Sequence, residues 1–188
     1  MKTIYNLSTY EKDKRMSINE LSDSYSKLDK NYWQKSKLQI QNIKYKKHLY
    51  EYFIYTFRTK KKGKAIWLIA GIHGEEPAGP NAIAKNIELI NKLGKKIPII
   101  LLPMCNPLGY IKNWRYRYYE KAPKEVNDID IKSVSSSEHY LINHEDTRKP
   151  RRNKPVCKEA ELLTNFALKI AKKYPTVLVL DLHEDNCL

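Results

Sequence analysis

The sequence predicts an α/β fold, built on a mainly parallel, mixed sheet that is flanked by helices. Three apolar segments predict its buried strands, at residues 65–70, 97–102 and 177–181. None of the three alternates apolar with polar residues, which is typical of parallel strands that are covered on both faces. Helical segments separate these strands along the chain, and the order strand, helix, strand favours parallel pairing.

Two elements precede the first buried strand. Ser17 and Glu20 are spaced as a capping box, which predicts a short helix over residues 18–29. Residues 49–58 are rich in aromatic and β-branched side chains and predict another strand. A polar turn at residues 60–64 follows, so we expect this strand to form a hairpin with the first buried strand.

Two longer helices are expected between the buried strands. The first covers residues 77–93, where isoleucines recur at helical spacing, and the second carries an apolar stripe over residues 160–174. Pro175 ends the second helix. Between the two, residues 109–156 are polar and lack periodicity, which is typical of functional loops.

Composition and charge indicate an ordinary soluble domain rather than a disordered or fibrous protein. The 188 residues include 35 Lys+Arg and 21 Asp+Glu, for a formal net charge of +14. No apolar stretch approaches the roughly 20 residues of a membrane-spanning helix, and none near the N-terminus has signal-peptide length. The 3 cysteines are far apart, which disfavours a disulfide framework or a thiolate zinc cage. We therefore expect a cytoplasmic protein without a membrane partner.

Polar residues form two clusters directly after buried strands, where open α/β sheets bind their ligands. His73 and Glu76 follow the first strand in the segment GIHGEEPAG, and His183 follows the third in DLHED. Two imidazoles and one carboxylate are typical of a catalytic zinc site, which keeps a fourth position for water. These residues are the predicted ligands of one zinc ion. The spacing leaves open whether Glu75 or Glu184 replaces Glu76.

These two segments, with CNPLGY and NWRY between them, resemble the zinc carboxypeptidase superfamily. The resemblance is closer to its bacterial carboxypeptidase-like and succinylglutamate desuccinylase/aspartoacylase-like members than to the digestive enzymes. It implies a zinc carboxypeptidase-like domain at residues 45–188, with residues 1–44 as a helical and extended segment that packs on it. It also implies that His73, Glu76 and His183 bind the zinc. The expected reaction is hydrolysis of an amide bond by zinc-activated water that attacks the carbonyl.

The resemblance implies roles for further residues near the zinc. Asn106 begins the asparagine-proline-x-glycine turn that is typical of the family, which makes it a candidate substrate contact. Arg115 follows that turn, and its guanidinium would stabilise the oxyanion that forms at the scissile carbonyl. Asp130 and Asp181 are alternative partners for orienting a zinc-bound histidine.

Two departures from the family bear on catalysis. The segment DIDIKS lacks the Asn-Arg pair that grips the substrate's carboxylate, so Arg148 and Arg151 are candidates for a clamp instead. The family's general base is a glutamate well downstream of the third ligand, and this chain stops at Leu188. We therefore expect an N-terminal portion, truncated at its C-terminus, with the base supplied from beyond it or by Glu184 or Glu75.

The surplus of positive charge favours substrates that end in a carboxylate, either a peptide or an N-acyl amino acid. The alternatives are an N-acyl amino acid deacylase, a catalytically inactive metal-binding fragment and a nucleic-acid-binding module. Residues 114–119 interleave cations with aromatic rings, as single-strand binders do. Nucleic acid is the less favoured partner because the cations are spread along the chain and no phosphate-binding loop is recognisable.

Overall fold

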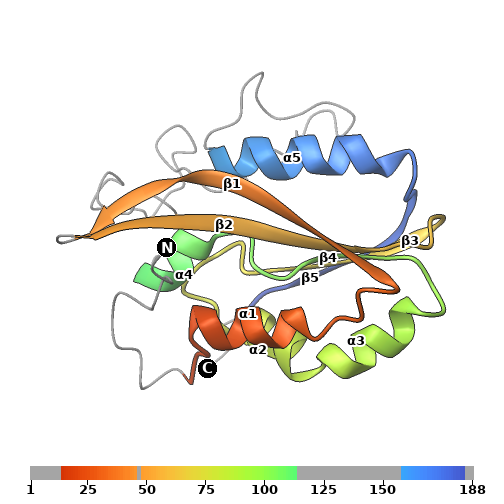
Figure 1. Cartoon of the computed structure of the whole chain (residues 1–188), viewed down its shortest axis with the longest axis horizontal. Coiled ribbons are helices and arrows are strands. Elements are labelled where there is room, and N and C mark those ends of the chain that lie inside the picture. The colour runs from red at the N-terminus through yellow and green to blue at the C-terminus, as the bar shows by residue number, and fades with distance from the viewer. Residues whose placement is uncertain (1–13, 46–47, 114–157, 185–188) are drawn as a thin grey trace.

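The computed structural model describes residues 14–45, 48–113 and 158–184, which form one mixed sheet between two layers of helices (Figure 1). Its strands are β1 (Trp33–Tyr45), β2 (His48–Thr59), β3 (Ala65–Ala70), β4 (Ile99–Leu102) and β5 (Thr176–Leu182). Its helices are α1 (Ile18–Ser26), α2 (Ala78–Lys85), α3 (Ile87–Gly94), α4 (Pro107–Lys112) and α5 (Lys158–Ala171). The predicted α/β class with a mixed sheet is confirmed.

The strand order is β1-β2-β4-β3-β5. β4, β3 and β5 are parallel neighbours, whereas β2 is antiparallel to both β1 and β4. The α1, α2 and α3 helices cover one face of the sheet and α5 covers the other (Figure 1). Because β3 lies at the centre of the parallel part, polar residues that follow it are supported by a strand on each side.

The predicted hairpin between β2 and β3 is wrong, because β4 lies between them and β2 pairs with β1 instead. The sequence of β1 is polar, as is typical of an edge strand that keeps charge on its surface. Two of its lysines lie over aromatic rings of β2: Lys35 Nζ lies 3.8 Å from the Tyr55 ring centroid, and Lys37 Nζ lies 3.3 Å from that of Phe53. The boundary predicted between residues 44 and 45 falls at the end of β1 and stays a prediction.

Each face of the sheet carries its own apolar core. Leu21 and Tyr25 of α1 pack with Ile83 of α2 on one face, and Trp67 of β3 packs with Phe166 of α5 on the other. The predicted stripe of α5 is therefore the side that faces the sheet. In the described parts of the chain, no helix combines the length and the apolar character that crossing a bilayer requires.

The apolar strand β5 lies at the edge of the sheet. The prediction that it is buried on both faces is wrong. Val177 is 58% exposed and Val179 49%, on one face, and Leu178 is 44% exposed and Leu180 42%, on the other. The described residues pair β5 with β3 alone. Apolar composition predicted the strand correctly, but it did not predict that the described residues leave both of its faces exposed.

The single helix predicted over residues 77–93 is divided at Asn86. This residue leaves helical geometry, with φ −103° and ψ 18°, and ends α2 while it begins α3. Its side-chain amide donates to the carbonyl of Ala82 at 2.9 Å. Such a side chain competes with the backbone for helical hydrogen bonds, which explains the local break.

The predicted capping box of α1 is present and gives a first testable expectation. Glu20 N donates to Ser17 Oγ at 3.2 Å, and Ser17 N donates to the Glu20 carboxylate at 2.6 Å. We expect Ser17→Ala to lower the free energy of unfolding by about 1 kcal/mol, measured by urea unfolding. Ser22→Ala, within the same helix, is the matched control, and an equal loss in both variants would contradict a capping role.

The capping box also makes the stability of α1 depend on pH. The hydrogen bonds from Ser17 lower the pKa of Glu20 below its usual value of 4.5. Because the folded state favours the charged carboxylate, this contribution is present above the usual pKa. It is lost as the pH falls through the lowered pKa of the folded state.

Candidate metal centre

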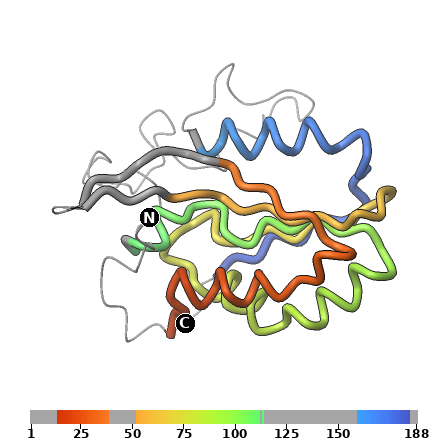
Figure 2. Tube along the Cα trace, in the orientation of Figure 1, coloured from red at the N-terminus to blue at the C-terminus, as the bar shows by residue number. Residues whose placement is uncertain are grey.

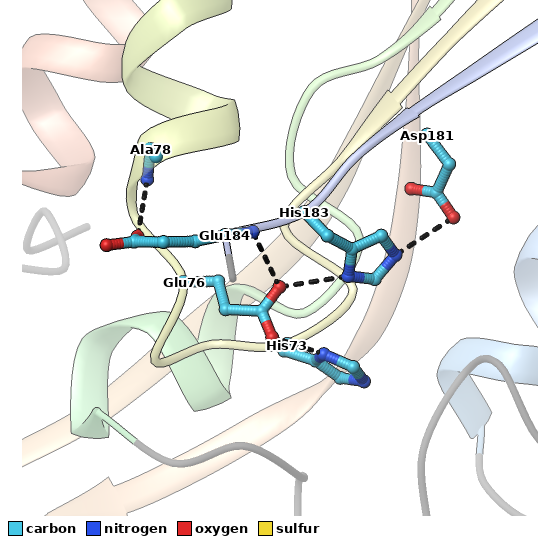
Figure 3. Close-up of polar contacts among 6 residues, drawn as sticks. All are labelled: His73, Glu76, Ala78, Asp181, His183 and Glu184. Carbon is cyan, nitrogen blue, oxygen red and sulfur yellow. Dashed lines mark hydrogen bonds and ion pairs between the residues drawn. The ribbon is translucent and has the colours of Figure 1, made fainter. Parts of the chain in front are cut away.

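The predicted ligands lie where two parallel strands end side by side (Figure 3). His73 and Glu76 belong to the turn between β3 and α2, and His183 follows β5 directly. The last residues of β3 and β5 pair, with Ala70 opposite Leu182. The register therefore brings together residues that are more than a hundred positions apart in the sequence.

The two histidines meet the same carboxylate. His73 Nδ1 lies 2.6 Å from Glu76 Oε1, and His183 Nδ1 lies 2.9 Å from Glu76 Oε2. The potential ligand atoms of the three residues all lie within 4.8 Å of one another. Both imidazoles thus direct Nδ1 at the Glu76 carboxylate. A divalent cation can bind between these three groups in place of the protons in their hydrogen bonds.

The chemistry of this cluster fits zinc. Two neutral imidazole nitrogens and one carboxylate oxygen are a typical ligand set of catalytic zinc, which binds three protein groups. His73 and Glu76 are buried, whereas the His183 side chain is 37% exposed. One side of the cluster is therefore open to water and to a substrate.

The charge of Glu76 suits a metal ligand. Burial raises the pKa of this carboxyl, but hydrogen bonds from His73, from the backbone N–H of Glu184 and from His183 outweigh it and lower the pKa overall. Glu76 is therefore a carboxylate at neutral pH. A carboxyl group has to be deprotonated to bind a metal ion, so the hydrogen bonds that lower the pKa of Glu76 also favour its metal-binding form.

Asp181 contacts the outer nitrogen of His183. Its Oδ2 lies 3.1 Å from His183 Nε2, so this carboxylate is placed to accept the Nε2 proton when Nδ1 binds a metal ion. Metal-binding histidines commonly have such a carboxylate partner, which fixes their tautomer and orientation. The geometry supports Asp181 in the role for which Asp130 was the alternative, and Asp130 lies outside the described residues.

The side chains of Glu184 and Asn106 both accept hydrogen bonds from backbone N–H groups at the start of a helix. The Glu184 carboxylate accepts a hydrogen bond from Ala78 N at 3.1 Å, at the first turn of α2, and is turned away from His183 (Figure 3). Asn106 Oδ1 accepts from Gly109 N at 3.0 Å and so caps α4. Their predicted roles in catalysis and substrate binding stay predictions. Arg115, Arg148 and Arg151 lie outside the described residues.

Cys105 lies just beyond β4 but is unsuited to the metal. It is 1% exposed, and its Sγ contacts the carbonyl of Leu102. Burial, together with the nearby charge of Asp181, raises the pKa of this thiol far above its usual value. A thiolate is the form that binds metal, so Cys105 is a packing residue here.

Arg15 supports the metal-binding turn and was not predicted. It is 9% exposed, and its Nη1 donates to the carbonyls of Gly74 at 3.2 Å and Tyr110 at 2.7 Å. Its Nη2 donates to Asn113 Oδ1 at 2.7 Å. The guanidinium thus ties the turn between His73 and Glu76 to α4. Its place in a run of charged residues gave no sign of this burial.

We expect Arg15→Met to weaken zinc binding by at least about 10-fold, the lower end of the loss that follows when a supporting partner of a ligand is removed. The free energy of unfolding should fall by about 1.5–3 kcal/mol, because buried carbonyls lose a charged donor. A chelator competition titration and urea unfolding measure the two quantities. Lys14→Met is the neighbouring control, and equal behaviour of both variants would contradict the supporting role.

One comparison with known proteins identifies a family. A family model described as zinc carboxypeptidase matches residues 33–186. No functionally curated protein matches the sequence.

Solved structures similar to this chain are considerably longer than it. One is a proposed metallopeptidase from Shewanella amazonensis, with a TM-score of 0.55 and 20% identity, over 89% of this chain and 54% of that one. An aspartoacylase family protein from Mesorhizobium loti has a TM-score of 0.51 and 19% identity, over 83% of this chain and 41% of that one. A proposed carboxypeptidase from Burkholderia mallei has a TM-score of 0.55 and 12% identity, over 93% of this chain and 41% of that one. The chain thus spans about half of these structures or less.

Proposed function

Because the chain belongs to the zinc carboxypeptidase family, we propose that it provides the metal centre for zinc-dependent hydrolysis of an amide bond. The observation that carries this proposal is the meeting of His73, Glu76 and His183 at the ends of β3 and β5. The closest rival from the sequence, a nucleic-acid-binding module, does not explain this cluster.

The residues of the centre have separable tasks. His73 and His183 would hold one zinc ion through Nδ1, and Glu76 would hold it through its carboxylate. When bound, zinc polarises a carbonyl group and lowers the pKa of a water molecule. Asp181 keeps His183 in the tautomer that binds, and Arg15 holds the turn that carries the other two ligands. The exposed side of His183 is the side from which substrate would approach.

The proton transfers need a further carboxylate. Water attack on an amide requires a group that takes a proton and returns it to the leaving amine. Glu184 and Glu75 are the candidates among the described residues, and the backbone N–H of Glu184 donates to Glu76 Oε2 at 3.2 Å. Glu184 would have to give up the hydrogen bond that it accepts from Ala78 N before it could serve as the base. We propose a base from outside this chain as the first choice and Glu184 as the second.

We propose a peptide with a free C-terminal carboxylate as the substrate class, and an N-acyl amino acid as the second candidate. The net charge of +14 favours either anionic substrate over a neutral one. Arg115 would support the developing oxyanion, and Arg148 and Arg151 would bind the substrate's carboxylate.

Amino-acid release from zinc-loaded protein tests the function. An N-blocked dipeptide with a free carboxylate, the same dipeptide amidated, and an N-succinyl amino acid distinguish the substrate classes. In a form of the protein that also supplies the base, we expect hydrolysis of the first, no hydrolysis of the amidated form, and loss of activity in His183→Ala. Such a form, folded and zinc-loaded, that releases no more amino acid than its His183→Ala variant from any substrate would overturn the proposed function.

A further inference from the structure

A groove of about 530 Å³ lies between α5 and the β1–β2 hairpin. Figure 2 shows α5 running alongside this hairpin, on the opposite side of the sheet from α1, α2 and α3. Gln34, Ser36 and Leu38 of β1 line it together because alternate residues of a strand share one face. The volume falls within the roughly 300–1,000 Å³ that is usual for ligand-binding pockets.

Among the described residues, the walls of the groove carry five cations and no acidic residue. Arg58, Lys60 and Lys62 come from β2 and the following turn, and Lys169 and Lys173 come from the end of α5 and the residues after it. In the described parts of the chain, none of the five forms an ion pair with a carboxylate. Arg58 is half-buried and held in place by its hydrogen bond to Ser36 Oγ at 3.2 Å. The groove is therefore lined by positive charges that no ion pair among the described residues neutralises.

The floor of the groove is apolar. Phe166, Ile170 and Tyr174 line it and are 6%, 5% and 3% exposed. Leu162 and Leu38 are half-buried at its sides, so they present apolar surface to an incoming group. An occupant with one apolar side chain between negative charges matches this surface.

Two other anionic occupants fit less well. The aromatic rings of the floor are too deeply buried to stack with bases, which is how single-stranded nucleic acids are usually held. Many phosphate sites add free backbone N–H groups or a helix N-terminus to their cationic side chains. Here the N–H groups of Lys60 and Gly63 already donate to Tyr32 and Lys173 carbonyls, and the cations lie near the C-terminal end of α5.

The groove is distant from the metal centre. Lys60 and Lys62 precede β3 and the metal-binding turn follows it, so the two sites lie at opposite ends of this strand. Six residues of β-strand span about 20 Å. We propose that the groove is a docking site for an extended acidic peptide segment of a partner protein, with its carboxylates on the five cations and an apolar side chain against Leu38 and Leu162.

Fluorescence anisotropy tests the docking site with defined probes. The main probe is a fluorescein-labelled heptapeptide of alternating glutamate and leucine, and the comparison probes replace glutamate with lysine or leucine with serine. We expect the acidic peptide to bind, the lysine peptide not to bind, and the serine peptide to bind more weakly. The double variant K169E/K173E should lose at least 10-fold in affinity, by reversal of two charges at the groove.

The matched control is K85E/K92E, which makes the same change in net charge on the exposed surfaces of α2 and α3. It should bind the acidic peptide with nearly wild-type affinity. An equal loss in both double variants, or no binding by wild type, would overturn the proposal. Tighter binding of a labelled oligothymidylate that K169E/K173E also weakens would overturn it in favour of nucleic acid. His73→Ala should bind the peptide normally, which keeps this test independent of the metal centre.

Discussion

Replacement of His73 by alanine is expected to reduce zinc affinity by more than about 100-fold, beyond the 10–100-fold cost of losing an outer partner of a ligand. The reason is that His73 and Glu76 lie on one short turn, and Nδ1 of the buried imidazole is aimed at the Glu76 carboxylate. Few other groups in the turn can replace it. Competition with a chromophoric chelator measures the affinity directly.

Matched variants make the His73 result specific. His183→Ala should lose zinc equally, and Asp181→Asn should lose only about 10–100-fold, because it contacts a ligand and not the metal. Glu75→Gln is the control, since Glu75 is exposed beside Glu76. Loss of zinc in Glu75→Gln with retention in Glu76→Gln would show that the neighbouring carboxylate is the ligand instead.

Gly74→Ala is expected to damage both the fold and the metal centre. A methyl group at Gly74 would lie 2.0 Å from the carbonyl carbon of Gly109 and 2.3 Å from Tyr110 N. Both are backbone atoms of α4, so the turn or the helix has to move. We expect a loss of about 1–3 kcal/mol in the free energy of unfolding, as overpacking typically costs, together with weaker zinc binding.

Urea unfolding of zinc-free protein and chelator competition separate the two effects of Gly74→Ala. Glu75→Ala, one position further along the same turn and exposed, is the control that changes a side chain without this clash. Unchanged stability and zinc affinity in Gly74→Ala would show that the turn does not depend on its close contact with α4.

Local patterns in the sequence predicted the elements on which the metal centre is built. Apolar runs identified β3, β4 and β5, and the ligand candidates were found because chemistry-bearing residues follow β3 and β5 immediately. Ser17 and Glu20 identified the beginning of α1 because a capping box is a contact between near neighbours in the chain. Each of these features depends on residues that are close together in the sequence, so the local pattern is sufficient to predict it.

Features that depend on distant contacts were not predicted. The insertion of β4 between β2 and β3, and the pairing of the polar strand β1, are decided by partners far away in the sequence. The burial of Arg15 depends on carbonyls of Gly74 and Tyr110 that only the folded chain brings near. β5 would have the same apolar sequence with or without a cover on its faces.

X-ray absorption at the zinc edge of protein loaded with one equivalent of zinc tests the central claim most directly. The account predicts a first shell of nitrogen and oxygen atoms at about 2.0–2.2 Å, with two imidazoles and no sulfur. The imidazole signal should fall by half in His183→Ala at the zinc concentration that still loads this variant. A sulfur shell near about 2.3 Å, or a spectrum unchanged by His183→Ala, would contradict the proposed centre.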